Sequence, residues 1–258
     1  MNEDFLKVAK QAALEAGEVI QKYSGKVHKM DIKDGDISDF ATEADIEAER
    51  VIVSILSTAF PDHNIIAEEE TNINKNSDYT WAIDPLDGTI SYAAGVPSFT
   101  VSIGLLKMNQ PILGVIYHIS DKDFYYAQKG KGAFLNNKRI SVSSKNKLQN
   151  SVISLDFGHK NQRQKKFKTY ISPLLTKVGY IYSLGSGALA LAYTANGVLE
   201  AHIQIGGVWD SLAGAAIIKE AGGKVTDLEG QEPQWSKEQV SVVVSNGLIH
   251  DQILEALG

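Results

Sequence analysis

The segment Asp84-Pro85-Leu86-Asp87-Gly88-Thr89 constrains this chain more than any other part of its sequence. It follows the apolar run Trp81-Ala82-Ile83, which is typical of a strand that ends where the segment begins. Asp-Pro and Asp-Gly pairs favour a tight turn. A turn braced by proline can direct its two carboxylates, three residues apart, toward one point.

Further carboxylates accompany this turn. Glu68-Glu69-Glu70 follows the apolar run Ile65-Ile66-Ala67, so the first glutamate is expected at the end of another strand. Asp210 lies far downstream in Trp209-Asp210-Ser211-Leu212-Ala213-Gly214. Mg²⁺ prefers oxygen ligands and keeps several waters. Carboxylates from these three segments, with a backbone carbonyl and substrate phosphate, therefore predict a magnesium site.

Composition excludes several classes of protein. A length of 258 residues with 43% hydrophobic and 22% charged residues is ordinary for one large or two small globular domains. A net charge of −6 argues against binding to the phosphate backbone of nucleic acid. The absence of cysteine excludes disulfides, thiolate metal sites and thiol nucleophiles. Without a signal pattern or an apolar run near about 18 residues, we expect a cytoplasmic protein with no membrane partner.

Hydrophobic periodicity organises the first half of the chain. Apolar residues at helical spacing predict one helix from Glu3 to about Tyr23 and a second from Thr42 to about Ala59, which Pro61 ends. Short apolar runs separated by turns then predict an antiparallel sheet under the two helices. These runs are Asn64–Ile66, Trp81–Ile83, Phe99–Leu106, Ile112–His118, Phe124–Ala127 and Ala133–Leu135.

The pattern changes after the polar stretch Ser141–Asn150, where strands and helices begin to alternate. The predicted strands are Val152–Leu155, Tyr180–Leu184, Leu199–Ile203 and Val240–Val244, and the predicted helices are Gly187–Ala195, Ser211–Ala221 and His250–Leu257. The change indicates an α+β domain over residues 1–145, which carries most of the predicted metal ligands, and an α/β domain over residues 146–258, which carries Asp210 and substrate contacts.

Taken in order, the acidic motifs resemble those of the inositol monophosphatase family of Mg²⁺-dependent, lithium-sensitive phosphatases, which belongs with the fructose-1,6-bisphosphatase-like sugar phosphatases. The resemblance runs from about Phe5 to the C-terminus. Weaker matches are Asp39-Phe40-Ala41-Thr42-Glu43-Ala44-Asp45, Gly130-Lys131-Gly132-Ala133-Phe134, Gly185-Ser186-Gly187-Ala188 and Glu220-Ala221-Gly222-Gly223. Each motif is weak alone, whereas the ordered set is specific. It implies a layered αβαβα fold that combines α+β and α/β features.

The resemblance implies the metal ligands and the cofactor. Asp84, which ends a strand and begins the turn, would bridge two metals. The other implied ligands are Glu68, the Leu86 backbone carbonyl for the first metal, and Asp87 and Asp210 for the second. Mg²⁺ is the implied cofactor, with Mn²⁺ as a substitute.

The resemblance also implies the groups that act on water and substrate. Glu68 and Thr89 would hold the attacking water, with Asp45 hydrogen-bonded to Thr89. The implied substrate contacts are Asp87, Gly88, Thr89, Gly185, Ser186, Gly187, Gln204 and Asp210. Lys33 corresponds to a lysine that the family places in a mobile loop. The family is commonly dimeric, so we expect a homodimer.

Plainer structural explanations exist for the same residues. Asp-Pro and Asp-Gly form turns without any metal, and three glutamates in a row are usually a solvated face. Thr42 and Asp45 match a helix capping box. Asp210 precedes a predicted helix and could act as its N-cap.

The expected function is hydrolysis of inositol monophosphate to inositol and phosphate by a metal-activated water. Fructose-1,6-bisphosphate, histidinol phosphate and a nucleotide or NADP are alternative substrates, and a non-catalytic partner of macromolecules is the alternative of another class. Family members that act on inositol phosphates often carry a glutamate shortly before the aspartate that matches Asp210, where this chain has Gln204. The missing charge weakens the inositol assignment and leaves the phosphatase assignment intact.

Overall fold

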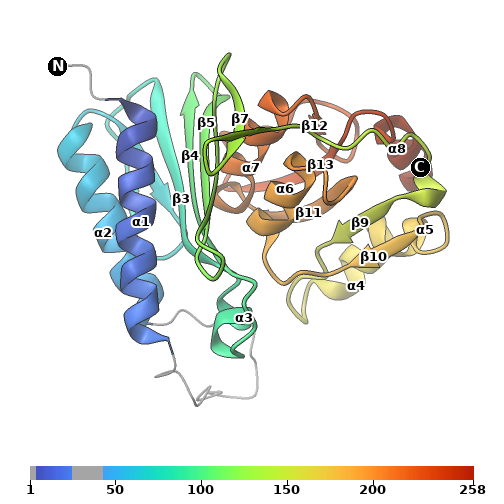
Figure 1. Ribbon diagram of the computed structural model, residues 1–258, viewed down its shortest axis with the longest axis horizontal. Helices are drawn as coiled ribbons and strands as arrows, with labels where there is room; N and C mark the ends of the chain where they lie inside the picture. Colours follow the sequence, from blue (N-terminus) through green and yellow to red (C-terminus); the bar gives the residue numbers. More distant parts are fainter. Residues whose placement is uncertain (1–3, 25–42) are drawn as a thin grey trace.

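The described residues of the computed structural model, 4–24 and 43–258, form two β-sheets and three layers of helices that alternate along the molecule (Figure 1). Helices α1 (Phe5–Tyr23) and α2 (Glu43–Ala59) cover the outer face of the large sheet. Helices α6 (Gly187–Ala195) and α7 (Val208–Glu220) lie between the sheets, and α8 (His250–Leu257) lies outside the small one. The predicted αβαβα layering is confirmed.

The large sheet brings the first acidic motifs to one edge. Its strands are β1 (Asn64–Ala67), β2 (Asn72–Ile73), β3 (Tyr79–Asp87), β4 (Thr100–Lys107), β5 (Gln110–His118), β6 (Asp123–Gln128), β7 (Gly132–Leu135) and β8 (Lys138–Ile140), in the order β2-β1-β3-β4-β5-β6-β7-β8. Strands β3 to β8 are antiparallel as predicted, whereas β1 runs parallel to β3. This parallel pair places Ala67 opposite Ile83, so Glu68 and Asp84 follow side by side.

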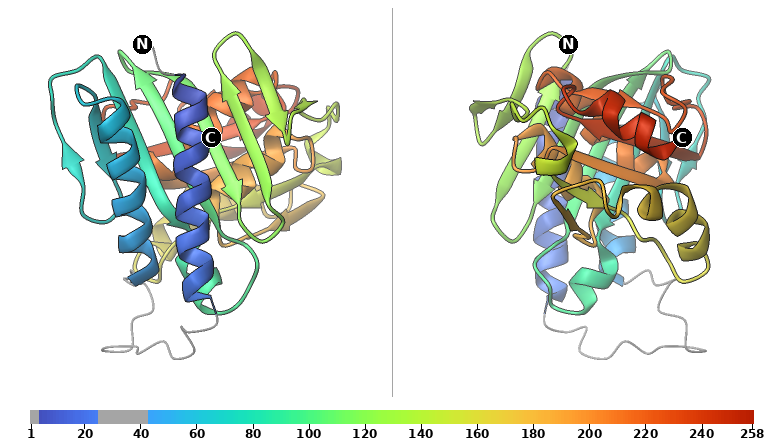
Figure 2. Two further views of the ribbon diagram at one scale, coloured as in Figure 1. Left: turned by 60° about the vertical axis from the view of Figure 1, so that its left-hand side comes forward. Right: turned by 90° about the vertical axis from the view of Figure 1, so that its right-hand side faces the viewer.

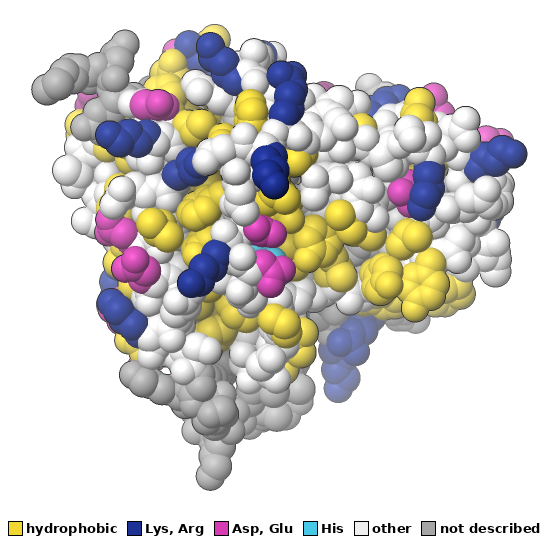
Figure 3. Space-filling model, in the orientation of Figure 1, with side chains coloured by type: hydrophobic (Ala, Val, Ile, Leu, Met, Phe, Trp, Pro, Cys, Tyr) yellow, Lys and Arg dark blue, Asp and Glu magenta, His cyan; other side chains and the backbone are white. Residues whose placement is uncertain are grey.

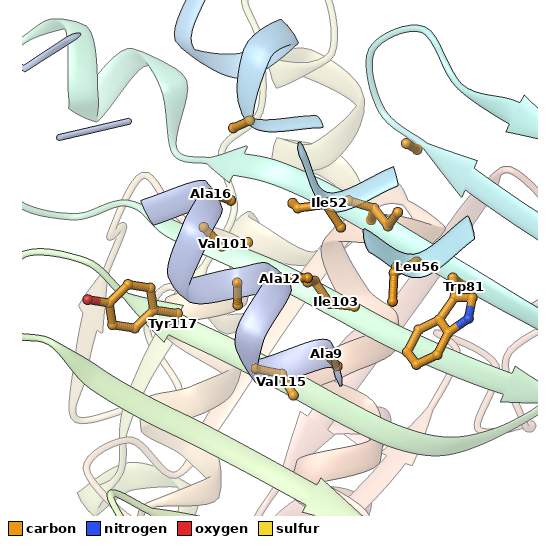
Figure 4. Packing of buried hydrophobic residues seen from close by; sticks show 14 of the residues in the cluster. Ala9, Ala12, Ala16, Ile52, Leu56, Trp81, Val101, Ile103, Val115 and Tyr117 are labelled. Carbon is orange, nitrogen blue, oxygen red and sulfur yellow. The ribbon is translucent and has the colours of Figure 1, made fainter. Parts of the chain in front are cut away.

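Small residues let the outer helices lie close to the large sheet. Ala9, Ala12 and Ala16 of α1 are buried against β4 and β5 (Figures 2 and 4). At Gly17 a Cβ atom would lie only 2.5 Å from Cε1 of Tyr117. From α2, Ile52 and Leu56 enter the same core (Figure 4). The resulting packing fixes α2, whose first turn carries Asp45.

The small sheet packs against the other side of helices α6 and α7. Its strands are β9 (Val152–Leu155), β10 (Tyr180–Tyr182), β11 (Ala201–Gly207), β12 (Lys224–Thr226) and β13 (Gln239–Ser245), in the order β10-β9-β11-β13-β12. Alternation along β13 separates two cores, because Val242 and Val244 pack in the cluster that contains α6 and α7, whereas Val243 packs in the cluster that contains α8. Residues from α8 and from the segment around Tyr170 form the outer core (Figure 2, right).

Several elements differ from the predictions. Four short helical elements were not predicted from the sequence: α3 (Thr89–Ala93), α4 (Arg163–Lys166), the π-helical turn Phe167–Ile171 and α5 (Ser172–Leu174). The basic, polar composition of residues 160–168 hides helical periodicity there. Strands β2, β8 and β12, of two or three residues each, are too short to produce a pattern.

The predicted division at residue 145 coincides with the connection between β8 and β9. The core between the sheets nevertheless includes Ala82 and Ile116 of the large sheet together with Val242 of the small one. The two-domain division therefore stays a prediction. Within residues 4–24 and 43–258, none of the helices is long and apolar enough to cross a membrane.

Candidate active site

Three of the predicted metal ligands meet where β1 and β3 end beside the first turn of α7. Glu68, Asp84 and Asp210 each offer a carboxylate oxygen, and these oxygens lie within 4.8 Å of one another. Asp84 is buried, Asp210 is partly buried, and Glu68 is exposed. The hydroxyl of Ser102 on β4 donates to the Trp209 carbonyl at 3.1 Å, which ties the large sheet to α7 beside Asp210.

The turn after β3 owes its shape to its own residues. An extra residue between Asp84 and Asp87 interrupts the pairing with β4, which suits Pro85 because proline cannot donate to a ladder. The Leu86 N–H donates to Oδ1 of Asp84 at 3.0 Å. Gly88 has a φ of 94°, and a Cβ atom there would lie 2.6 Å from the Ser98 carbonyl. Only glycine fits this turn without strain.

Thr89 connects the turn to α2. Its hydroxyl lies 3.3 Å from Oδ1 of Asp45 and 3.0 Å from the Leu86 carbonyl oxygen. Asp45 is buried in the first turn of α2. The contact between Thr89 and Asp45 that the family resemblance implies is therefore present in the structure.

Asp87 is hydrogen-bonded to the start of α6 and to β4. Its carboxylate accepts hydrogen bonds from the Ser186 hydroxyl, the Ala188 N–H at 2.8 Å, the Gly187 N–H at 3.2 Å and the Thr100 hydroxyl at 3.3 Å. Free N–H groups and the positive end of the helix dipole attract a carboxylate to the start of a helix. Asp87 thus caps α6, and its role as a metal ligand stays a prediction.

Asp210 lies inside α7 rather than before it. The helix begins at Val208, so the predicted start at Ser211 is wrong, and the alternative explanation of Asp210 as the N-cap residue does not hold because that residue is Gly207. The Gly207 N–H donates to Oδ2 of Asp210 at 2.8 Å. A Cβ atom at Gly206 would lie 2.3 Å from the same oxygen, so the small residues before the helix leave room for the carboxylate. One side chain therefore stabilises the helix start and contributes to the acidic cluster.

Gln204 differs from the prediction that it contacts substrate. Its side chain is 2% exposed, and the two ends of its amide lie 2.7 Å from Nε2 of His202 and 2.7 Å from Oγ of Ser211. The alternation of β11 points it inward, under Gly187, where a Cβ atom would lie 2.3 Å from the amide. Both ends of the amide already contact protein side chains, so Gln204 packs beneath the start of α6 and is not free to bind substrate.

This buried contact predicts a pH-dependent defect in Gln204→Glu. Oε1 of Gln204 lies against Nε2 of His202, and the NH₂ group of Gln204 donates to the Ser211 hydroxyl. Burial lowers the pKa of His202, whose Nδ1 contacts the Ser154 carbonyl at 3.2 Å. A glutamate has no proton to donate at neutral pH, and it would raise the pKa of His202 by pairing with the imidazolium. That pair is lost as pH rises. We expect the melting temperature to fall below wild type by about 5 °C, mainly at alkaline pH.

Thermal melting of the variant and wild type across pH measures this effect. Gln204→Leu is the control, because it removes both contacts at every pH and should give a deficit that does not change with pH. A Gln204→Glu deficit independent of pH would contradict the proposed pairing with His202.

The cluster carries unbalanced negative charge. Burial, followed by repulsion from neighbouring acids, raises the pKa of Asp84 and Asp210 well above the usual range. Glu68 reaches the surface, yet it lies against protein and other carboxylates, and burial raises its pKa to about 7. Burial also raises the pKa of Asp87. Among the described residues, no lysine, arginine or histidine forms an ion pair with these acids.

Such a set of groups fits a hard divalent cation. Oxygen donors lie close together, are partly buried and repel one another, and a cation of charge +2 relieves the repulsion. Glu68, Asp84 and Asp210 could hold it as they stand, and the Leu86 carbonyl borders the same turn. Lys33 and Thr42, to which the sequence also assigned roles, lie outside the described residues.

One buried acid next to the cluster was not predicted. Glu49 of α2 is 2% exposed and accepts hydrogen bonds from the backbone N–H groups of Glu69 and Glu70. Its spacing of four residues from Asp45 places both acids on one face of the helix. This spacing of two acids was the only hint of Glu49 in the sequence. Because acids four residues apart are also common on solvent-exposed helices, the spacing alone did not predict a buried role.

The layered fold and the acidic cluster define the class of metal-dependent sugar and polyol phosphatases. The sequence profile described as "Inositol monophosphatase family" matches residues 1–258, and the chain belongs to this family. It is 34% identical to an inositol-1-monophosphatase of Mesorhizobium japonicum, over 98% of this chain and 95% of that protein. It is 35% identical to a fructose-1,6-bisphosphatase/inositol-1-monophosphatase of Aquifex aeolicus, over 97% of this chain and 94% of that protein.

A solved structure agrees with this assignment. The extragenic suppressor protein suhB from Bartonella henselae superposes with a TM-score of 0.88 at 32% identity, covering 97% of each chain. The chain is therefore a phosphatase of the inositol monophosphatase family. The names of these relatives differ in substrate, so family membership does not define which phosphate ester this protein hydrolyses.

Proposed function

We propose that this protein is a Mg²⁺-dependent phosphatase that hydrolyses inositol monophosphate to inositol and phosphate. The observation that carries the proposal is the approach of the Glu68, Asp84 and Asp210 oxygens to within 4.8 Å at the start of α7. The motifs of the family occur at the same place. Glu68, Asp84, Asp210, the Leu86 carbonyl and a reoriented Asp87 would hold the metal, with Mn²⁺ as a substitute.

The protein's own groups would orient the reactants. Bound Mg²⁺ would lower the pKa of water and neutralise negative charge on the phosphate. Thr89 donates its hydroxyl proton to Asp45 or to the Leu86 carbonyl, so its oxygen can accept a proton from the attacking water. The Glu68 carboxylate can accept the other proton. Held between two acceptors, the water keeps a lone pair directed at phosphorus.

The substrate would lie between the turn after β3 and the start of α6. The backbone of Gly88 and Thr89 would bind phosphate oxygens, while Asp210 and the small residues Gly185, Ser186 and Gly187 would contact the polyol. Asp87 already links the two segments through its bonds to α6. A net charge of −6 argues against nucleic acid as the substrate. We further propose inhibition by Li⁺, a homodimer and a cytoplasmic location.

Substrate choice is decided by phosphate release from a panel of esters with Mg²⁺. We expect turnover of inositol-1-phosphate, and of fructose-1,6-bisphosphate as a second substrate, since the Aquifex relative bears both names. Histidinol phosphate, NADP and nucleotide 3′-phosphates complete the panel. If one of these is hydrolysed and inositol-1-phosphate is not, the inositol assignment fails while the phosphatase assignment stands.

Thr89→Val tests the orientation of the water. Valine keeps the shape and removes the hydroxyl, so we expect kcat to fall by about 10-fold to 100-fold with little change in KM. Asp45→Asn should act in the same direction. Steady-state kinetics of both variants and of the double variant measure the effect. If the two losses simply multiply, Thr89 and Asp45 do not act as a unit.

A further inference from the structure

Glu49 makes two hydrogen bonds to the segment that carries Glu68. Its Oε2 accepts from the Glu69 N–H at 2.9 Å, and its Oε1 accepts from the Glu70 N–H at 3.0 Å. The side chain is 2% exposed, so water does not compete for these bonds. A carboxylate suits the position because it offers two acceptors and no donor, whereas an amide offers only one acceptor.

The backbone at Glu68 is thereby held from two sides. On the sheet side, the Glu68 N–H donates to the Ile83 carbonyl of β3 at 3.1 Å, and the Ala67 N–H donates to the Thr71 carbonyl at 2.8 Å. On the helix side, Glu49 binds the two N–H groups that follow. The Glu68 side chain reaches solvent and contacts the Asp84 carboxyl group. The position from which it extends is set by this backbone segment.

Helix α2 contacts both groups that would orient the water. Asp45 reaches the Thr89 hydroxyl at 3.3 Å, and Glu49, one turn later on the same buried face, reaches the segment of Glu68. The negative charge of Glu49 repels the carboxylates of Glu68 and Glu69, and this repulsion disfavours an acid at position 49. Two charge-assisted hydrogen bonds offset that repulsion, because such bonds are about twice as strong as neutral ones.

We infer that Glu49 is a positioning residue: by binding the backbone after Glu68, it keeps the Glu68 carboxylate in place relative to the Thr89 hydroxyl. Asp45 positions Thr89 in the same way. The inference rests on the proposed phosphatase function for its kinetic consequence. Its structural consequence, the ordering of the Glu68–Glu70 segment, does not depend on activity.

Two variants and a control test the inference. Glu49→Gln keeps the shape but turns an NH₂ group toward one backbone N–H, and Glu49→Asp keeps the charge but is too short to reach both. Glu47→Gln is the matched control, because Glu47 is an exposed residue of the same helix whose carboxylate binds the Tyr23 hydroxyl. Thermal melting first shows which variants are folded. If only one Glu49 variant folds, its measurements can still overturn the inference.

The first readout is amide hydrogen exchange in metal-free protein. Glu69 and Glu70 should exchange at least about tenfold faster in both Glu49 variants, while amides of β4 stay unchanged. The second readout is Mn²⁺ binding measured by calorimetry without substrate, which should weaken about tenfold. The third is kcat with inositol-1-phosphate, which should fall about tenfold to a hundredfold at unchanged KM, because small displacements of an orienting group are costly. Glu47→Gln should match wild type in all three.

Two outcomes would overturn the inference. The first is wild-type exchange and wild-type kcat in each Glu49 variant that folds. The second is a defect in Glu49→Gln with wild-type behaviour of Glu49→Asp, because the effect would then come from charge and not from the two hydrogen bonds. If wild-type protein releases phosphate from no ester, the proposed function fails, and the exchange and Mn²⁺ measurements still decide the role of Glu49.

Discussion

Removal of divalent metal with EDTA is expected to abolish phosphate release, and Mg²⁺ or Mn²⁺ to restore it. Hydrolysis of a phosphate monoester faces one of the highest uncatalysed barriers, and lowering it requires beyond about 20 kcal/mol of stabilisation. The cluster of Glu68, Asp84 and Asp210 is negatively charged and repels a phosphate unless a cation neutralises it. Phosphate release in chelator, with and without added metal, checks this. Full turnover in EDTA would refute the metal-dependent mechanism.

The same cluster predicts how metal-free protein responds to pH. Burial and neighbouring acids raise the pKa of Glu68 from its ordinary 4.5 to about 7, so between these values the folded protein binds more protons than the unfolded chain. Stability in EDTA should therefore fall as pH rises through this range. Metal needs deprotonated ligands, so the increase in melting temperature caused by Mg²⁺ should grow with pH. A metal effect that is constant across pH would contradict the assigned ligands.

Long, strongly patterned segments determine most of this fold. The periodicity of α1, α2 and α8 and the apolar runs of the large sheet predicted their elements closely, because each buries one continuous face. The helical stretch after Phe157 was missed although its Tyr170 and Leu174 are buried, because the run of basic and polar residues from 160 to 168 hides the periodicity. The parallel pairing of β1 with β3 was also missed, since strand direction depends on the path of the chain between strands and not on the strand sequences.

The site shows the same division. Glu68, Asp84 and Asp210 were predicted as one group, and the structure brings their oxygens together. The start of α6 attracts Asp87, and the pleat of β11 turns Gln204 inward. Glu49 could not be found from the sequence, since its partners are backbone N–H groups, which every residue except proline possesses. The exposed surface in Figure 3 mixes both signs of charge with apolar side chains and offers no simpler guide to the site.

Asp84→Asn should lower kcat by more than about 100-fold, because it removes the most buried charge from the set that would hold the metal. The fold should survive. An asparagine oxygen can still accept from the Leu86 N–H at the 3.0 Å contact that shapes the turn. Burial already raises the pKa of Asp84 well above its usual range, so a neutral amide removes repulsion, and the metal-free variant should melt at or above the wild-type temperature.

Loss of activity combined with unchanged or higher stability separates a chemical role from a structural one. Asp62→Asn is the matched control, because Asp62 is exposed in the loop after α2. It should keep wild-type kcat. Steady-state kinetics, Mn²⁺ calorimetry and thermal melting of the two variants make the comparison. A folded Asp84→Asn enzyme with a near wild-type rate would show that the metal does not depend on Asp84, and the bridging role would then have to be abandoned.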